Sequence, residues 1–382
     1  MYRRIALWGV LGAILLGLAG FAGWILTLPP AAAAATAPAI DGQETADTLA
    51  ALKPPTRERP LIAIIGLNDA TETTDYLMPY GILRRAEIGD VVALATGPGP
   101  VTLYPALKIE PDATVAEFDT LHPEGADYVV VPAMSRDDDP AVLRWVRSQA
   151  DKGAVVIGIC AGAKIVGEAG LLDGRRATTH WYYLEEMSEK HPALRYVADR
   201  RLVVDEGVAT TTGITASMPM MLTLIEAIAG RGKAEAVASD LGLANWDARH
   251  ASEAFKFTRP FALTAIGNGL AFWNRERLGI ELRTGMDEVS LALVADAWSR
   301  TYRSNAVTFA GSAAAIETRN GIRIIPDQVE RGWPDELLLS QVDSRPPAIA
   351  LDEALRQIGA RYGTRTADFV AMQLEYPGQA AR

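Results

Sequence analysis

The sequence is poor in the residue types that build disulfide and metal-linked scaffolds. Its 382 residues include one cysteine, Cys160, and four histidines. A single cysteine cannot form an intramolecular disulfide, and the scattered histidines lack the close spacing of ligands in a structural zinc site. The sequence therefore predicts no disulfide, no metal and no other cofactor.

Clusters of basic residues are also missing. Acidic side chains outnumber basic ones by 47 to 37, which gives a net charge of -10 and a pI near 5.1. Proteins that bind nucleic acid use clustered Lys and Arg against the phosphates. The last third of the chain contains no basic recognition helix either, so we expect no nucleic-acid partner.

Charge is absent between Ile5 and Leu28. A helix of this length can cross a hydrocarbon core of about 30 Å. Trp8 and Trp24 lie near the ends of the stretch, and Arg3 and Arg4 precede it. Because basic residues favour the cytoplasmic side, the pattern predicts a cytoplasmic segment 1–4 and a transmembrane helix 5–28. We expect a single-pass protein of the inner membrane, with the lipid bilayer as a partner and the remaining chain on the extracytoplasmic side.

The alternative for this stretch is a cleaved signal peptide, because residues 33–35 (Ala-Ala-Ala) offer a small-residue cleavage site. Residues 29–60 are rich in Ala, Pro and Thr and show no apolar periodicity. They are predicted to form a flexible tether, with the folded domain beginning near Leu61.

Short apolar runs alternate with amphipathic segments after residue 60. The runs, predicted to be buried parallel strands, are 61–66, 91–95, 128–131 and 154–159, and the segments predicted to be helices are 76–84 and 140–149. This order predicts an α/β fold with a flavodoxin-like parallel sheet sandwiched by helices. Ligands of such sheets bind at the carboxyl ends of the strands.

One strand end has the pattern of a nucleophile elbow. Gly158 and Gly162 flank Cys160 at two positions on either side, and a helix is predicted to follow. Small residues allow the sharp strand-to-helix turn that presents a nucleophile. A thiol at a helix start is favoured as thiolate by the partial positive charge there. The alternative is that Cys160 is a small buried apolar residue.

The residues after the cysteine resemble a known family. The stretch 167–181 reads Gly-Glu-Ala-Gly-Leu-Leu-Asp-Gly-Arg-Arg-Ala-Thr-Thr-His-Trp, and further matches lie at 75–80 and 212–216. This run resembles the ThiJ/PfpI superfamily, which has a class I glutamine amidotransferase-like fold. The similarity is greatest to the branch of isonitrile hydratases and of the amidase-like domain in AraC-type regulators. The resemblance covers residues 61–230.

The resemblance implies candidate site residues. Cys160 matches the family nucleophile, Asp75 the acid that hydrogen-bonds it, and His180 a histidine near the cysteine. A buried, protonated carboxyl group can donate to a thiolate and act as a general acid. Asp75 is alternatively a helix N-cap, and His180 alternatively a structural hydrogen-bonding residue. The oxyanion and pocket positions implied by the resemblance are Ala133, Met134, Ala161, Gly213, Ile214 and Thr215.

Two positions depart from the family pattern. Residues 132–135 (Pro-Ala-Met-Ser) stand where the family commonly has a Gly-Gly turn, so Met134 is expected to narrow the pocket. Ala161 stands where hydratase-like members often have Thr or Ser, which removes a hydroxyl that orients substrate. The resemblance therefore does not imply isonitrile hydration as such.

The remaining chain divides into a connecting helical region 231–280, an α/β extension 281–374 and a tail 375–382. Residues 281–329 look like a degenerate copy of the first half of the domain, because Ile-Pro-Asp at 325–327 aligns with Glu-Pro-Asp at 110–112 at an offset of 215 (327 − 112). That offset places Ser290 opposite Asp75 and Arg300 opposite Arg85. The alternative is an unrelated extension and a chance match.

Three functions follow from these residues. The first is a cysteine-dependent hydrolase or hydratase acting on a small molecule, with Cys160 as nucleophile and Asp75 as acid. The second is a ligand-binding or redox-sensing module related to the sensory domain of AraC-type regulators. The third is a scaffold without chemistry. A small-molecule ligand or substrate is expected, and a homodimer stays open.

Overall fold

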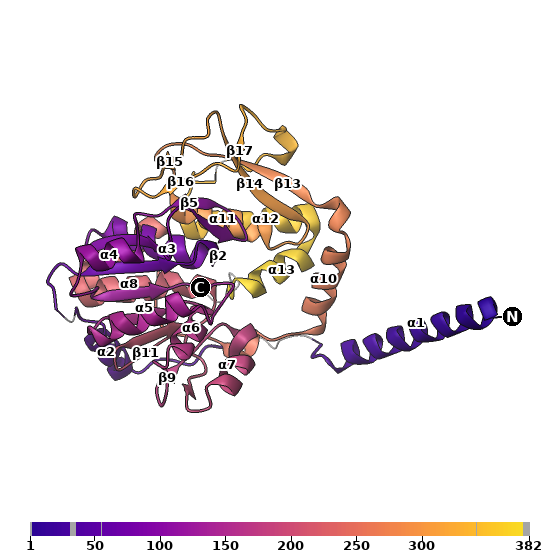
Figure 1. Ribbon diagram of the computed structural model, residues 1–382, viewed down its shortest axis with the longest axis horizontal. Helices are drawn as coiled ribbons and strands as arrows, with labels where there is room; N and C mark the ends of the chain where they lie inside the picture. The colour runs from indigo at the N-terminus through magenta and orange to yellow at the C-terminus, as the bar shows by residue number, and fades with distance from the viewer. Residues whose placement is uncertain (1, 31–35, 55, 341, 377–382) are drawn as a thin grey trace.

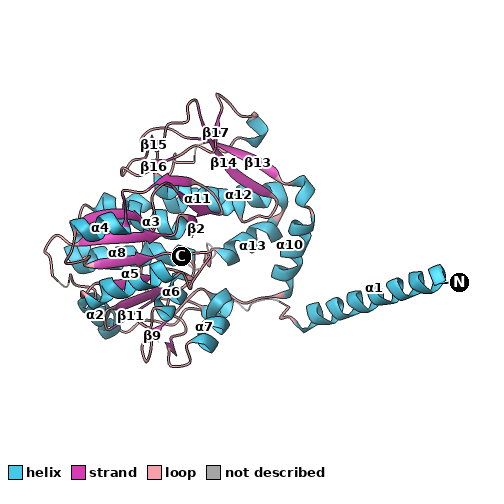
Figure 2. Cartoon of the chain, viewed as in Figure 1, coloured by secondary structure: helices cyan, strands magenta, loops and turns pink. Residues whose placement is uncertain are grey.

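The computed structural model describes all residues except 1, 31–35, 55, 341 and 377–382 (Figure 1). Its main body is a seven-stranded sheet in the order β11-β12-β8-β7-β1-β3-β6. The strands are β1 (Leu61–Gly66), β3 (Asp90–Ala95), β6 (Ala113–Thr114), β7 (Tyr128–Val131), β8 (Val155–Gly158), β11 (Leu202–Asp205) and β12 (Val208–Thr211). All neighbours pair in parallel except β11 and β12. Figure 2 shows this sheet between layers of helices.

The helices of the main body cover both faces of the sheet because the central strands are apolar along their whole length. Every residue of β1, β7 and β8 is buried. The helices are α3 (Thr73–Ala86), α4 (Val115–Leu121), α5 (Pro140–Asp151), α6 (Gly162–Glu168), α7 (Leu184–Lys190), α8 (Ser217–Ala229) and α9 (Arg231–Leu241). The predicted flavodoxin-like α/β fold is confirmed, with the four predicted strands at β1, β3, β7 and β8.

The C-terminal third forms a second layer that packs on α3. Its parallel sheet β13-β14-β17 comprises β13 (Glu276–Glu281), β14 (Ser304–Ala310) and β17 (Gln328–Val329). Its helices are α10 (Arg259–Leu270), α11 (Glu288–Ser299), α12 (Pro347–Tyr362) and α13 (Thr364–Gln373). A five-stranded sheet joins the two layers, with β15 (Ile316–Glu317), β16 (Arg323–Ile324), β5 (Lys108–Glu110), β4 (Val101–Tyr104) and β2 (Asp69–Glu72) in this order. Helix α11 lies against α3 and α12.

The N-terminal stretch forms helix α1 (Tyr2–Thr27), which extends away from the main body in Figure 1. Among the residues that the structure describes, no helix has both the length and the apolarity needed to cross a bilayer. The predicted transmembrane helix 5–28 and the single-pass inner-membrane location are therefore wrong, and the predicted bilayer partner has no support. The prediction rested on the sequence pattern alone, a stretch without charged residues that Arg3 and Arg4 precede.

The end of α1 contacts the protein. The Arg259 guanidinium donates hydrogen bonds to the carbonyl oxygens of Ile25, at 3.1 Å, and Leu26, at 3.0 Å. The Trp24 ring lies 6.3 Å from that of Phe257. The cleavage site predicted at 33–35 lies outside the described residues.

The region predicted as a tether contains helix α2 (Gly42–Ala51), whose following residue Leu52 is fully buried. A bidentate pair joins Glu44 of this helix to Arg200, with N to O distances of 2.6 and 2.8 Å. Most of the predicted tail 375–382 lies outside the described residues, and its first two residues, Glu375 and Tyr376, are buried.

Candidate functional site

Cys160 lies in a strained turn between β8 and α6. Its φ of 57° is in the left-handed region, which residues with a side chain rarely adopt. The Cys160 N–H donates to Thr211 Oγ1 at 2.9 Å, and the Thr179 hydroxyl donates to the Cys160 carbonyl at 3.2 Å. A Cβ at Gly162 would overlap the carbonyl oxygen of Val131. The backbone of Cys160 is therefore held from both sides, in a turn that requires the second glycine of the pattern.

The Cys160 side chain is nearly enclosed, with 5% of the residue exposed. Burial raises the pKa of the thiol, and the neighbouring carboxyl groups of Asp75 and Glu72 raise it further. The N–H of Ala161 acts in the opposite direction, as expected at a helix start, but burial outweighs it. Burial therefore opposes the effect of the helix start and favours the protonated thiol.

Asp75 lies in the first turn of α3 and is fully buried. Its Oδ2 accepts a hydrogen bond from the N–H of Ala133 at 3.2 Å, while its buried Oδ1 has no hydrogen-bond partner among the described residues. Burial raises the pKa of this carboxyl well above its usual range. The N-cap of α3 is Glu72, so the alternative role of Asp75 as an N-cap is not what the structure shows.

An ion-pair network from the C-terminal layer lies against this acid. The Arg300 guanidinium contacts Glu72 Oε1 at 2.5 Å and Asp296 Oδ1 at 2.6 Å. The Thr74 hydroxyl donates to Asp296 Oδ2 at 3.1 Å. Burial raises the pKa of Glu72 and of Asp296, and the positive charge of Arg300 acts against both increases. Three carboxyl groups, counting that of Asp75, therefore share one guanidinium.

His180 is buried and uses both ring nitrogens in local structure. Its Nδ1 accepts from the N–H of Tyr182 at 3.1 Å, so in the neutral ring Nε2 carries the proton and donates to the Gln373 carbonyl at 3.0 Å. Burial lowers the pKa of His180, which favours this neutral form. The ring is therefore engaged as the structural alternative describes.

The remaining predicted pocket residues separate into two groups. Ala133, Met134, Ala161 and Ile214 line a cavity together with Cys160 and His180. Gly213 and Thr215 do not line it and instead hold the C-terminal segment. The Gly213 N–H donates to the Glu375 carboxylate, and the Thr215 hydroxyl donates to the Glu375 carbonyl.

Comparison with known proteins finds a family match over the first part of the chain. A model of the DJ-1/PfpI family matches residues 62–227. Isonitrile hydratase from Pseudomonas putida is 33% identical over 168 residues, which are 43% of this chain and 70% of the relative. The chain belongs to the DJ-1/PfpI family. This result confirms the ThiJ/PfpI resemblance.

Two further similarities are more partial. The HTH-type transcriptional regulator CdhR from Pseudomonas aeruginosa is 41% identical over 86 residues, 22% of this chain and 25% of the regulator. The crystal structure of Drosophila melanogaster DJ-1beta has 23% sequence identity and a TM-score of 0.44, over 49% of this chain and 100% of that chain. The DJ-1/PfpI match ends at residue 227, so the C-terminal third lies beyond it.

The cavity beside Cys160 has a volume of about 590 Å³, and residues beyond the DJ-1/PfpI match supply much of its wall. Its aromatic lining includes Tyr104, Tyr182, Phe257, Phe261, Tyr302 and Phe369. Sequence reasoning missed all six of these, and also missed Arg300 as a site residue. No single sequence pattern marks these residues, because they come from separate elements that meet only in the folded chain.

Proposed function

We propose that the protein is a cysteine-dependent hydrolase or hydratase for a small, largely apolar molecule. The observation that carries this proposal is Cys160, which lines the cavity from a strained turn, together with the neighbouring Asp75, a buried carboxyl with an unpartnered oxygen that does not itself line the cavity. A backbone conformation this unfavourable persists where the surrounding structure enforces it, and such positions cluster at active sites. The isonitrile hydratase relative supports the same class of chemistry.

In the proposed reaction, the Cys160 sulfur forms a bond to an electrophilic carbon of the substrate. Asp75 gives its proton to the substrate atom that receives the electron pair, and the thiol proton replaces it on Asp75. In a hydration, water then adds to the same carbon, the carbon to sulfur bond breaks and a proton of the water returns to the sulfur. With an amide, the amine leaves with the proton from Asp75 as the thioester forms, and water then releases the acid from the sulfur. Because burial keeps Asp75 protonated, this residue is suited to the role of acid.

Two backbone N–H groups have roles in the proposed reaction. The N–H of Ala133 holds Asp75, so its hydrogen bond orients the acid. The N–H of Ala161 lowers the pKa of the thiol and is therefore directed at the sulfur, where it stabilises developing negative charge. Ala161 brings no hydroxyl to the cavity, which favours a substrate oriented by its apolar body.

A turnover assay tests the proposal. The full chain is incubated with a panel of isonitriles, nitriles and amides with aromatic or alkyl groups, and product is counted per chain. We expect repeated turnover for at least one class, complete loss in Cys160→Ser, and a loss of kcat of about 100-fold or more in Asp75→Asn. Ser290→Ala, a buried hydroxyl that does not line the cavity, is the matched control and should keep wild-type activity.

A ligand-binding module is the second candidate, favoured by the commitment of both His180 nitrogens to structure. It predicts saturable binding of one molecule per chain without product, and binding that survives Cys160→Ser. Oxidant sensing is disfavoured, because sensor cysteines combine a low pKa with exposure, whereas Cys160 has neither.

A further inference from the structure

The C-terminal layer repeats the elements of the first half of the family domain at a constant offset. Strand β13 begins 215 residues after β1 (276 − 61), α11 begins 215 after α3 (288 − 73), and β17 begins 215 after β6 (328 − 113). The strand order β13-β14-β17 repeats the order β1-β3-β6, again with parallel pairing.

Individual hydrogen bonds repeat at the same offset. Asp112 Oδ2 accepts from the N–H of Ala93 at 2.8 Å, and Asp327 Oδ2 accepts from the N–H of Thr308 at 2.9 Å. The differences 327 − 112 and 308 − 93 are both 215. A chance match of one tripeptide does not explain agreement in elements, strand order and side-chain contacts.

The two segments contact each other as the halves of a twofold dimer do. In such an interface, each contact between residue i and partner residue j recurs between j and i. Arg85 pairs with Asp287 at 2.8 Å, and Arg300 pairs with Glu72 at 2.5 Å. These pairs exchange under the offset, because 85 + 215 is 300 and 72 + 215 is 287.

Other contacts are reciprocal in the same way. A Cβ added to Gly81 would lie 2.6 Å from Val289, and Thr74 donates to Asp296. The offset exchanges these two pairs, because 81 + 215 is 296 and 74 + 215 is 289. Ile109 pairs with Ile324, its own equivalent, between the antiparallel strands β5 and β16. The pseudo-twofold axis therefore passes near this pair.

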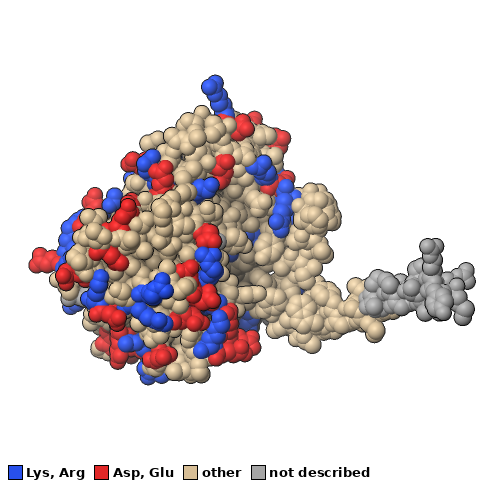
Figure 3. Space-filling view, viewed as in Figure 1, with Lys and Arg blue, Asp and Glu red and all other residues tan. Residues whose placement is uncertain are grey.

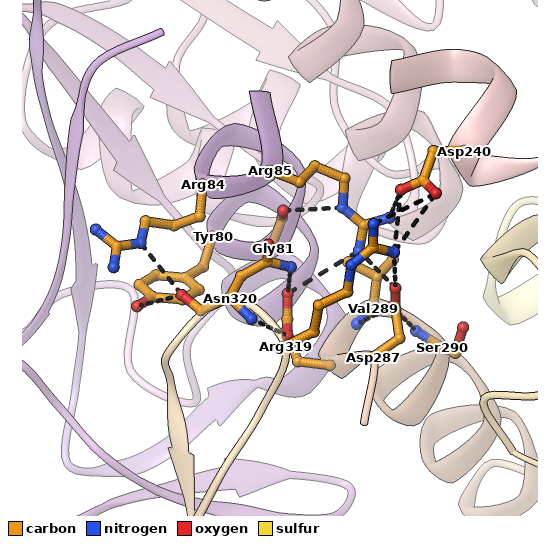
Figure 4. A network of polar contacts seen from close by, with 11 residues as sticks. Tyr80, Gly81, Arg84, Arg85, Asp240, Asp287, Val289, Ser290, Arg319 and Asn320 are labelled. Carbon is orange, nitrogen blue, oxygen red and sulfur yellow. Dashed lines mark hydrogen bonds and ion pairs between the residues drawn. The ribbon is translucent and has the colours of Figure 1, made fainter. Parts of the chain in front are cut away.

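We propose that residues 276–329 are an internal second copy of residues 61–114 that takes the place of a partner subunit and completes the Cys160 site through Arg300 as a positioning residue. The copy retains the equivalent of Arg85 but has Ser290 at the position of Asp75. Figure 4 shows the opposite end of the interface, where Arg85 reaches Asp240 and Asp287 away from the cavity. The copy thus supports the one site of the first half.

Arg300 acts through the carboxyl groups that it contacts. The titratable and charged groups around Cys160 and Arg300 come from several elements: Glu72 and Asp75 at α3, Asp296 of α11, the ion pair of Lys164 and Asp137, His180, Tyr183, Tyr302 and Glu375. Without the positive charge of the guanidinium, the negative charges of the carboxylates in this set disfavour the thiolate more strongly. Loss of Arg300 should therefore make the Cys160 thiolate harder to form.

The test is the pH profile of Cys160 alkylation by iodoacetamide in the full chain. We expect Arg300→Met to move the profile to higher pH by about one unit, as an uncompensated like charge does. Arg300→Lys should restore the wild-type profile. Arg85→Met, which breaks the reciprocal ion pair, is the matched control and should leave the profile unchanged. Near-ultraviolet circular dichroism verifies the fold, and Arg300→Gln replaces the methionine variant if the latter does not fold.

An unchanged profile in the folded Arg300 variants would overturn the proposal, as would equal shifts in the Arg300 and Arg85 variants. The proposal uses the function proposed above only in taking Cys160 as the site, and alkylation reports the thiol whether or not a substrate is turned over. Failure of the turnover assay and failure of this test are therefore distinguishable.

Discussion

The two ends of the α3 and α11 contact hold similar residues in different arrangements. At one end, Asp287 caps α11, because its Oδ1 accepts from the N–H groups of Val289 and Ser290 at 3.0 Å. At the other end, Glu72 occupies the N-cap position of α3 but makes no cap hydrogen bond, and its carboxyl contacts Arg300. A missing cap costs a helix about 1 kcal/mol.

The difference shows that the helix end beside the site lacks a stabilising cap. The longer Glu72 side chain brings its carboxyl group into the network beside Cys160, whereas the shorter Asp287 completes its own helix. Figure 3 shows acidic and basic side chains intermixed over one face of the main body, whereas Glu72, Asp75 and Asp296 are buried. The end at which the helix start lacks its cap is the end that we propose to carry chemistry.

Removing the arginine of each reciprocal ion pair in turn should give the largest difference in the free energy of unfolding. Arg300→Met leaves buried Glu72 and Asp296 without their cation and should lower the free energy of unfolding by about 3–5 kcal/mol. Arg85→Met should cost about 1.5–3 kcal/mol, because Asp240 among its partners is 40% exposed. Urea denaturation at neutral pH measures both, and equal losses would remove the contrast.

The close approach of the helices is tested at Gly81. An added methyl group would overlap Glu288 and crowd Val289, so Gly81→Ala should destabilise the protein by about 1–3 kcal/mol. Gly232→Ala is the control, since nothing lies near a Cβ there and helix propensity improves. If Gly81→Ala unfolds at the wild-type urea concentration, the tight α3 and α11 contact is not real.

The buried carboxyl groups predict a pH dependence of stability. The folded-state pKa of Asp75 is raised, so its contribution is complete below the pKa of the unfolded chain, near 4, and is lost as pH rises toward the folded-state value. We expect the unfolding free energy to fall with rising pH by up to about 1.4 kcal/mol per unit of raised pKa. Asp75→Asn should flatten this slope, whereas Ser290→Ala should not change it.

The smallest effect concerns the ends of the two repeated segments. Strand β6 leads into α4 through a capping box, in which the Thr114 side chain accepts from the N–H of Glu117 and the Glu117 side chain accepts from the N–H of Thr114. Val329, the equivalent of Thr114 in the second segment, starts no α-helix. Thr114→Ala should lower thermal stability by about 1 kcal/mol. Val329→Ala, at an exposed position, should leave the melting temperature within error.

Sequence reasoning predicted the fold of the first half well because its determinants are local. The central strands are short apolar runs, and the glycines around Cys160 mark a turn that few other residues permit. The same reasoning found Ala133, Met134, Ala161 and Ile214 through the family resemblance, and these residues do line the cavity.

The rest depends on contacts between distant residues. Nothing near Arg300 in the sequence indicates that it meets Glu72, which lies 228 residues earlier. His180 precedes Trp181 in a family motif, yet its ring bonds to Gln373, far along the chain. The start of the chain misled for the converse reason, because its local pattern was read without regard to the rest of the structure.

The most direct test of the central claim is the pH profile of Cys160 alkylation in the wild type and in Asp75→Asn. If thiol and carboxyl titrate as a coupled pair, the wild type should react in two steps, with the first proton lost above the usual carboxyl range and the second above the usual thiol range. Asp75→Asn should react in one step. A single ordinary thiol step, near pH 8.5 and unmoved by Asp75→Asn, would contradict the account.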